Sequence, residues 1–174
     1  QGYKFGLLIH MGLYSELGTV ESWGLCPEDW VGRPGYDDYY DYARDYRNAS
    51  LRFNPIKFDP EKWAKAFKGS GAKYIIYSTK HHDGFCLYDT KYTDFKVTNP
   101  EFPFASNPRS DVYGEIMEAC RNEGMVVGAY FSKPGWTSPH FWWPYYPPKD
   151  RNPTYDITKH PDRWKRFVDY THKQ

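Results

Sequence analysis

Long hydrophobic runs are missing from this sequence. A helix that crosses a bilayer needs about 18 or more predominantly apolar residues, and the apolar runs here are far shorter. The opening residues, QGYKFGLLIHMG, also lack the long apolar segment and the small-residue cleavage site of a secretory signal peptide. We therefore expect no membrane partner.

Cysteine is scarce, and the three residues present do not form a pattern. Cys26, Cys86 and Cys120 have no metal-ligand spacing, and any disulfide scheme leaves one of them unpaired. We interpret them as small buried hydrophobic residues.

An excess of charge of either sign is also absent. Lys and Arg number 23 against 22 Asp and Glu, which gives a formal net charge of +1. A protein that binds nucleic acid through its phosphates usually carries a clear basic surplus. We expect no nucleic-acid partner, and a ligand that is neutral or small.

Aromatic residues, in contrast, are abundant. They make up 20% of the chain, with 7 Trp, 17 Tyr and 11 Phe. Rigid rings suit the C–H faces and hydroxyl edges of sugars, the bases of single-stranded nucleic acid, or a protein partner. The balanced charge favours sugars. The alternative interpretation is a thick aromatic core with tyrosine-rich loops.

Three short, continuous apolar runs predict β-strands. Each is too short for an amphipathic helix, and continuous runs are typical of parallel strands that are covered on both faces. The predicted strands span residues 5–9, 74–78 and 126–131.

Helix signals lie between these runs. Asp59 followed by Pro60 predicts the start of one helix, and Asp111 predicts the start of a second that ends at Gly124. A third helix is expected from about Pro161 to the end of the chain. Alternating helices and apolar strands predict right-handed βαβ crossovers and a parallel sheet.

The connections are asymmetric, because the segments after the strands are long whereas the helix-to-strand turns are tight. This asymmetry is typical of a (β/α)8 TIM-like barrel, whose site lies at the carboxyl ends of its strands. A doubly wound sheet is the alternative, but no glycine-rich phosphate turn follows a strand. With only three strands visible, we expect residues 1–174 to be the N-terminal portion of one catalytic barrel domain, without a second domain.

Histidines follow two of the predicted strands. His10 comes at the end of the first, and His81 and His82 come directly after the second, before an Asp83-Gly84 turn. A neutral imidazole both donates and accepts hydrogen bonds, so two or three of them can recognise the hydroxyls of a sugar ring. The alternative is that these histidines are hydrogen-bonded structural residues.

A metal site is a competing interpretation of the histidines. Neighbouring histidines on an extended segment usually point apart, and the sequence has no His-x-His or cysteine pair. We therefore predict that no metal is bound and that no cofactor is needed.

Two further post-strand segments carry candidate residues. At the end of the third strand, Tyr130 and Ser132 alternate on one face, and Trp136 begins an aromatic loop that continues with Trp142, Trp143, Tyr145 and Tyr146. After the first strand come Glu21, Trp23, Glu28, Asp29 and Trp30. We expect the carboxylates of this segment to pair with Arg33 or Arg44 as surface charges.

Three segments together carry a family resemblance. They are KFGLLIHMGLYS, the long run from FDPEKW to KYTDF that includes KHHDGF, and GMVVGAYFSKPGW. The chain resembles the α-L-fucosidases of glycoside hydrolase family 29 over nearly its whole length. The resemblance implies that a fucose unit of an oligosaccharide or glycoconjugate is bound by His10, Trp23, His81, His82 and Tyr130. Glu21 and Trp136, in the segments that follow the first and third strands, are further candidates for this site.

The resemblance also implies a retaining mechanism with two carboxyl groups about 5–5.5 Å apart. The nucleophilic aspartate of similar enzymes follows the fourth strand in a segment like Trp-x-Asp-Gly, which we expect beyond Gln174. We therefore expect the rest of the barrel to be needed for activity, and the isolated chain to be inactive. A sugar-binding or scaffolding module without catalysis is the alternative. By resemblance, the enzyme is periplasmic, secreted or lysosomal.

Overall fold

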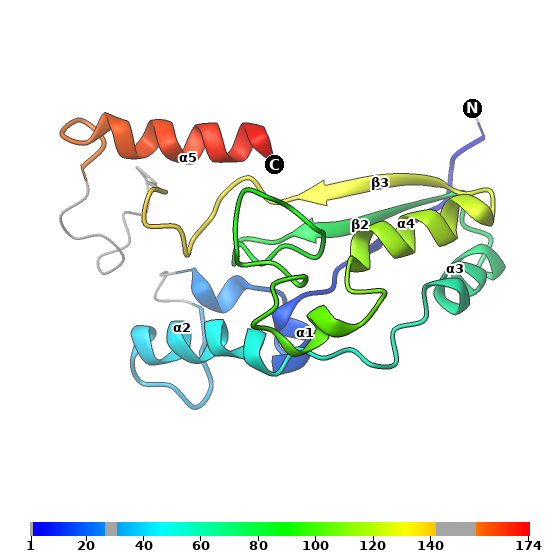
Figure 1. Ribbon diagram of the computed structural model, residues 1–174, viewed down its shortest axis with the longest axis horizontal. Helices are drawn as coiled ribbons and strands as arrows, with labels where there is room; N and C mark the ends of the chain where they lie inside the picture. Colours follow the sequence, from blue (N-terminus) through cyan, green and yellow to red (C-terminus); the bar gives the residue numbers. More distant parts are fainter. Residues whose placement is uncertain (1, 27–30, 142–155) are drawn as a thin grey trace.

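A three-stranded parallel sheet forms the centre of the molecule. The computed structural model describes residues 2–26, 31–141 and 156–174. The strands are β1 (Gly6–Ile9), β2 (Tyr74–Lys80) and β3 (Val126–Phe131), in the order β1-β2-β3, and both pairings are parallel (Figure 1). The three predicted strands are confirmed. β1 begins one residue later than predicted, and β2 continues two residues further.

Two helices cover one face of the sheet. They are α3 (Pro60–Gly69) and α4 (Val112–Asn122), which lie side by side and precede β2 and β3 (Figure 1). Ile75 and Tyr77 of the central strand are fully buried in the same core as the helix residues Ala64 and Ile116. Burial of this apolar surface between sheet and helices is the main stabilising contribution to the fold.

The sequence signals for these helices act as predicted. The side chain of Asp59 accepts a hydrogen bond from the backbone N–H of Lys62, and that of Asp111 accepts one from Gly114. Such caps satisfy backbone donors that have no partner within the helix. At the turn before β3, Gly124 has a φ of 72°, a conformation that favours glycine.

The opposite face of the sheet is open within the described residues. Leu8 of β1 is 56% exposed and Val126 of β3 is 48% exposed. Leu8 lies opposite Ile76, which in turn lies opposite Gly128, so this register defines one continuous apolar face. The observed fold is α/β with a parallel sheet, consistent with a partial (β/α) barrel.

The segments that follow the strands are long, as predicted, and they contain further helices. After β1 come α1 (Leu13–Leu17), η1 (Trp23–Leu25), α2 (Tyr39–Asn48) and η2 (Ala49–Leu51). The segment after β2 holds η3 (Pro103–Ser106), and α5 (Pro161–Lys173) follows β3. Figure 1 shows α2 and α5 beyond the carboxyl ends of the strands. α5 confirms the prediction of a third helix, whereas α1 and α2 were not predicted.

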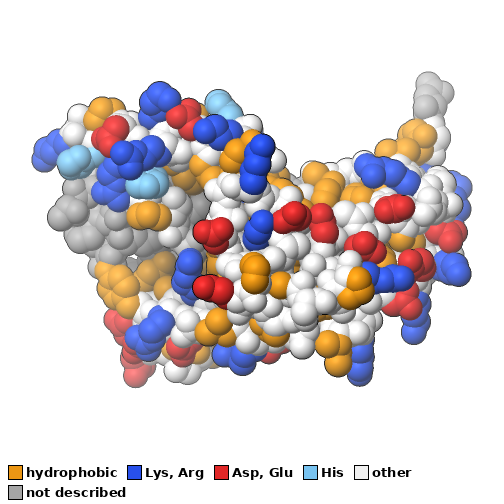
Figure 2. All heavy atoms as spheres, viewed as in Figure 1, with side chains coloured by type: hydrophobic (Ala, Val, Ile, Leu, Met, Phe, Trp, Pro, Cys, Tyr) orange, Lys and Arg blue, Asp and Glu red, His pale blue; other side chains and the backbone are white. Residues whose placement is uncertain are grey.

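The surface reflects the balanced composition. Figure 2 shows Lys and Arg side chains interspersed with Asp and Glu over the described part of the face in view. Of the described helices, none is both long enough and apolar enough to cross a membrane.

Candidate active site

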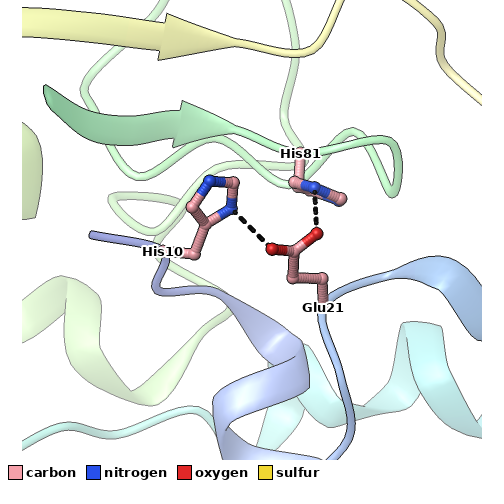
Figure 3. A group of neighbouring side chains, drawn as sticks. All are labelled: His10, Glu21 and His81. Atoms are coloured by element: carbon pink, nitrogen blue, oxygen red, sulfur yellow. Dashed lines mark ion pairs between the residues drawn. The ribbon is translucent and has the colours of Figure 1, made fainter. Parts of the chain in front are cut away.

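Three side chains meet at the carboxyl edge of the sheet. His10 directly follows β1, His81 directly follows β2, and Glu21 lies between α1 and η1 (Figure 3). The Glu21 carboxylate lies between the two imidazoles, with Oε1 3.4 Å from Nδ1 of His10 and Oε2 3.0 Å from Nε2 of His81. The parallel register of β1 and β2 brings the two histidines together, because both strands end at the same edge.

The residues next to Glu21 hold this cluster in place. The indole N–H of Trp23 donates a 2.8 Å hydrogen bond to Oε2 of Glu21, and Oγ of Ser22 lies 2.5 Å from Nδ1 of the buried His81. Glu21 has a φ of 49°, in the left-handed region that non-glycine residues seldom adopt. Such strain persists where surrounding contacts enforce it, and it is common at functional sites.

Aromatic rings surround the imidazoles. The rings of His82 and Trp136 stack with centroids 4.1 Å apart, and Trp23 lies 5.4 Å from Trp136. On the other side, the ring of Tyr130 lies 4.7 Å from that of His10 and stacks on that of His81 at 5.9 Å. The cluster therefore has an apolar, aromatic wall around polar ring nitrogens.

All seven candidate residues lie in one place in the structure. Three segments that are distant in sequence contribute them, each at or just beyond the carboxyl end of one strand. Their role in binding a ligand stays a prediction. They are His10, Glu21, Trp23, His81, His82, Tyr130 and Trp136.

The expectation that neighbouring histidines point apart is wrong here. The ring centroids of His81 and His82 are only 4.6 Å apart. The reason is that the extended backbone ends at Lys80, and the N–H of Gly84 donates a 3.2 Å hydrogen bond to the carbonyl of His81. In such a turn, successive side chains no longer point to opposite sides as they do along a strand. Gly84 has a φ of 82°, which the Asp-Gly turn requires.

The prediction that Glu21 pairs with Arg33 or Arg44 is also wrong. Arg33 donates to the backbone carbonyls of Gly24 and Cys26, and Arg44 pairs with Asp41 at 2.8 Å. Glu21 instead faces the two histidines, and its backbone is in the left-handed conformation. Glu28, Asp29 and Trp30, and the aromatic residues 142–146, lie outside the described residues.

Burial keeps the two neighbouring imidazoles neutral. Desolvation, with a smaller contribution from neighbouring positive charge, lowers the pKa of His81 to about 3. Desolvation likewise lowers the pKa of His82 to about 4. At neutral pH each ring therefore has one donor and one acceptor nitrogen, the pair of functions that a sugar hydroxyl also has.

A buried polar network supports the turn that carries these rings. The hydroxyl of Tyr46 donates to Oδ2 of Asp83 at 2.8 Å, the N–H of Phe85 donates to Oδ1 at 3.0 Å, and Nζ of Lys80 donates to the carbonyl of His81 at 3.0 Å. Burial raises the pKa of the Asp83 carboxyl and lowers that of the Lys80 ammonium. Both Asp83 oxygens are thus occupied by structural donors. Sequence reasoning missed Tyr46, which lies on the unpredicted helix α2.

Ser132 and Tyr130 lie on the same side of β3, as their alternation predicts. The hydroxyl of Ser132 donates a 3.1 Å hydrogen bond to the hydroxyl oxygen of Tyr130, while the Phe131 ring lies 4.9 Å from Nζ of Lys80. The hydrogen bond between Ser132 and Tyr130 helps to fix the Tyr130 ring beside His10 and His81.

A parallel α/β sheet whose carboxyl edge carries an aromatic-walled cluster of polar side chains has the layout of a (β/α)-barrel enzyme site. The family model for α-L-fucosidase matches residues 1–174, and the chain belongs to this family.

Similarity to individual proteins agrees with the family. Human tissue α-L-fucosidase is 32% identical over 147 residues, which are 78% of this chain and 29% of the human protein. The solved structure of α-L-fucosidase isoenzyme 1 from Paenibacillus thiaminolyticus is 37% identical with a TM-score of 0.70, covering 98% of this chain and 36% of that one.

A third similar protein is a family 29 α-L-fucosidase from Bacteroides thetaiotaomicron, solved as a trapped covalent intermediate with 2-fluoro-fucosyl fluoride. It is 29% identical with a TM-score of 0.66, covering 98% of this chain and 35% of that one. The chain spans 29% of the human relative and 35–36% of the two solved structures.

Proposed function

We propose that this chain is part of a retaining α-L-fucosidase that hydrolyses terminal α-L-fucosyl linkages in glycans and glycoconjugates. The observation that carries the proposal is the convergence of three chain segments, each at the carboxyl end of a strand, on one aromatic-walled cluster of histidines and a glutamate. The family membership of the chain supports the same substrate class.

The cluster has the chemistry to recognise fucose. His10, His81 and His82 present ring nitrogens for hydroxyl groups, and the Glu21 carboxylate adds an acceptor. The Trp23 and Trp136 rings offer apolar surface to the C–H face and the methyl group of the sugar. The neutral rings of His81 and His82 can bind a neutral sugar without the cost of burying an unpaired charge.

The covalent step needs a nucleophilic carboxylate and a second carboxyl group about 5–5.5 Å away. Both oxygens of Asp83 are occupied, so Glu21 is the carboxylate that the described residues place in the cluster. We propose that the nucleophilic aspartate follows a fourth strand of a (β/α)8 barrel and belongs to a part of the enzyme outside these 174 residues. The coverage of the relatives, 29–36% of their length, supports this proposal.

One observation favours a second candidate function, a carbohydrate-binding module without catalysis. The described residues bring a binding cluster together with a single available carboxylate, Glu21, and binding needs no second one. The two functions differ in whether a bound fucoside is cleaved.

The experiment uses the product of the complete gene and nitrophenyl α-L-fucoside. We expect release of nitrophenol, with α-L-fucose as the first anomer seen by proton NMR, because two successive displacements retain the configuration. Nitrophenyl β-L-fucoside is the control and should not be cleaved. Binding of fucose without cleavage would favour the module, and β-L-fucose as the first product would contradict the retaining mechanism.

The family resemblance also favours a place of action in the periplasm, in the lysosome or outside the cell. Fractionation of cells that express the complete gene tests this, and recovery of the protein in the cytosolic fraction would contradict it.

A further inference from the structure

Two ring nitrogens lie close to the Glu21 carboxylate, but their geometry does not suit hydrogen bonds to it. Nδ1 of His10 and Nε2 of His81 lie 3.4 and 3.0 Å from the two carboxylate oxygens, and both are buried without a hydrogen bond of proper geometry (Figure 3). His81 is only 2% exposed. A buried ring nitrogen without a hydrogen bond costs free energy unless another ligand engages it.

The spacing of these atoms fits a shared metal ion. Zinc binds histidine nitrogen and carboxylate oxygen at about 2.0–2.2 Å, so two ligands at tetrahedral angles lie about 3.3–3.6 Å apart. The separation of 3.4 Å between His10 Nδ1 and Glu21 Oε1 lies in this range, and that of 3.0 Å between His81 Nε2 and the other oxygen, Oε2, is slightly shorter. One donor atom from each of His10, Glu21 and His81 can be chosen so that all three lie within 4.8 Å of one another.

The chemistry of the donors also fits. Two imidazoles and one carboxylate form a zinc ligand set that leaves a fourth position open. Ser22 lies 2.5 Å from the far ring nitrogen of His81, where it can accept the N–H that a metal-binding histidine keeps. Trp23 holds one Glu21 oxygen at 2.8 Å and so restricts the carboxylate.

We propose that His10, Glu21 and His81 form a site for a divalent metal of the zinc type, and that a metal bound there excludes the sugar. The second half rests on the proposed function, because the same ring nitrogens serve the fucose hydroxyls. The metal acts as an inhibitor and is not required for the reaction.

The test is a calorimetric titration of zinc chloride into the protein without sugar. Glu21→Gln and His10→Ala should each weaken zinc binding about tenfold or more, since each removes one of three ligands. Glu16→Gln and His172→Ala are matched controls, because Glu16 lies near Arg52 and His172 is exposed on α5. The controls should leave the affinity unchanged. Equal zinc affinity in all four variants and the parent would overturn the site.

A measurement on the unaltered protein guards against misfolded variants. Cobalt(II) should give the intense visible absorption of a four-coordinate site, and zinc should abolish it by displacement. Weak absorption typical of six-coordinate cobalt would overturn the site. Fucose should raise the apparent dissociation constant of zinc, and simultaneous binding would overturn the exclusion. If fucose does not bind at all, the proposed function fails, whereas the zinc titrations still decide the metal site.

Discussion

The hydroxyl of Tyr46 donates a 2.8 Å hydrogen bond to Oδ2 of Asp83 and thereby joins α2 to the turn that follows β2. Asp83 is 1% exposed, and its other oxygen accepts from the N–H of Phe85. The two residues before Asp83 are His81 and His82, so the position of both imidazoles depends on this buried carboxylate. The Tyr46–Asp83 hydrogen bond thus helps to position the candidate site.

Replacing Tyr46 by Phe should therefore destabilise the protein. The substitution keeps the ring but removes a donor from a buried carboxylate, which costs about 1–3 kcal/mol. Urea denaturation followed by circular dichroism measures the change. Tyr3→Phe is the control, because Tyr3 is 64% exposed, and it should not alter the unfolding midpoint. An unchanged midpoint for Tyr46→Phe would show that Asp83 does not rely on this bond.

The thiols should differ sharply in reactivity. Cys86 and Cys120 are fully buried, and burial raises the pKa of Cys86 to about 12 and that of Cys120 to about 11. At pH 8 both are protonated and inaccessible, whereas Cys26 is partly exposed. With Ellman's reagent we expect about one thiol to react in the native protein and all three in denaturant. Reaction of all three before unfolding would contradict the burial of Cys86, in the segment after β2, and of Cys120 on α4.

The 174-residue chain expressed by itself should release no nitrophenol from nitrophenyl α-L-fucoside. We expect the described residues to bind the sugar and place the nucleophile outside this sequence, and without a nucleophile the covalent step cannot occur. The comparison is with the complete gene product at equal molar concentration, after the mass of each is checked. Turnover at comparable rates would mean that the catalytic carboxylate lies within this chain, and Glu21 would be the first residue to replace.

Much of the fold could be predicted from the sequence because its signals are local. The apolar runs of β1, β2 and β3 and the aspartate caps of α3 and α4 lie within a few residues of the structure that they specify. α2 escaped prediction for a physical reason. Its buried face consists of Tyr42 and Tyr46, and a helix made of tyrosine and charged residues shows no aliphatic periodicity.

The candidate site was predictable only in part. His10, His81 and His82 follow apolar runs, so their meeting at one sheet edge follows from parallel topology. The position of Glu21 does not follow from the topology. It involves a left-handed backbone and a contact with His81, a residue 60 positions away in the chain. The proximity of the His81 and His82 rings depends on the turn from His81 to Gly84, which begins directly after β2 and which the rule of alternating side chains along a strand does not describe.

Calorimetric titration with L-fucose tests the central claim, that this cluster binds the fucosyl unit, most directly. The complete protein should bind fucose, and His82→Ala should weaken binding by about 1–3 kcal/mol, or about 5- to 150-fold, because a buried sugar hydroxyl loses its partner. His172→Ala, on the exposed side of α5, should bind as the parent protein does. Equal affinity of His82→Ala and the parent for fucose would contradict the assignment of this cluster as the sugar pocket.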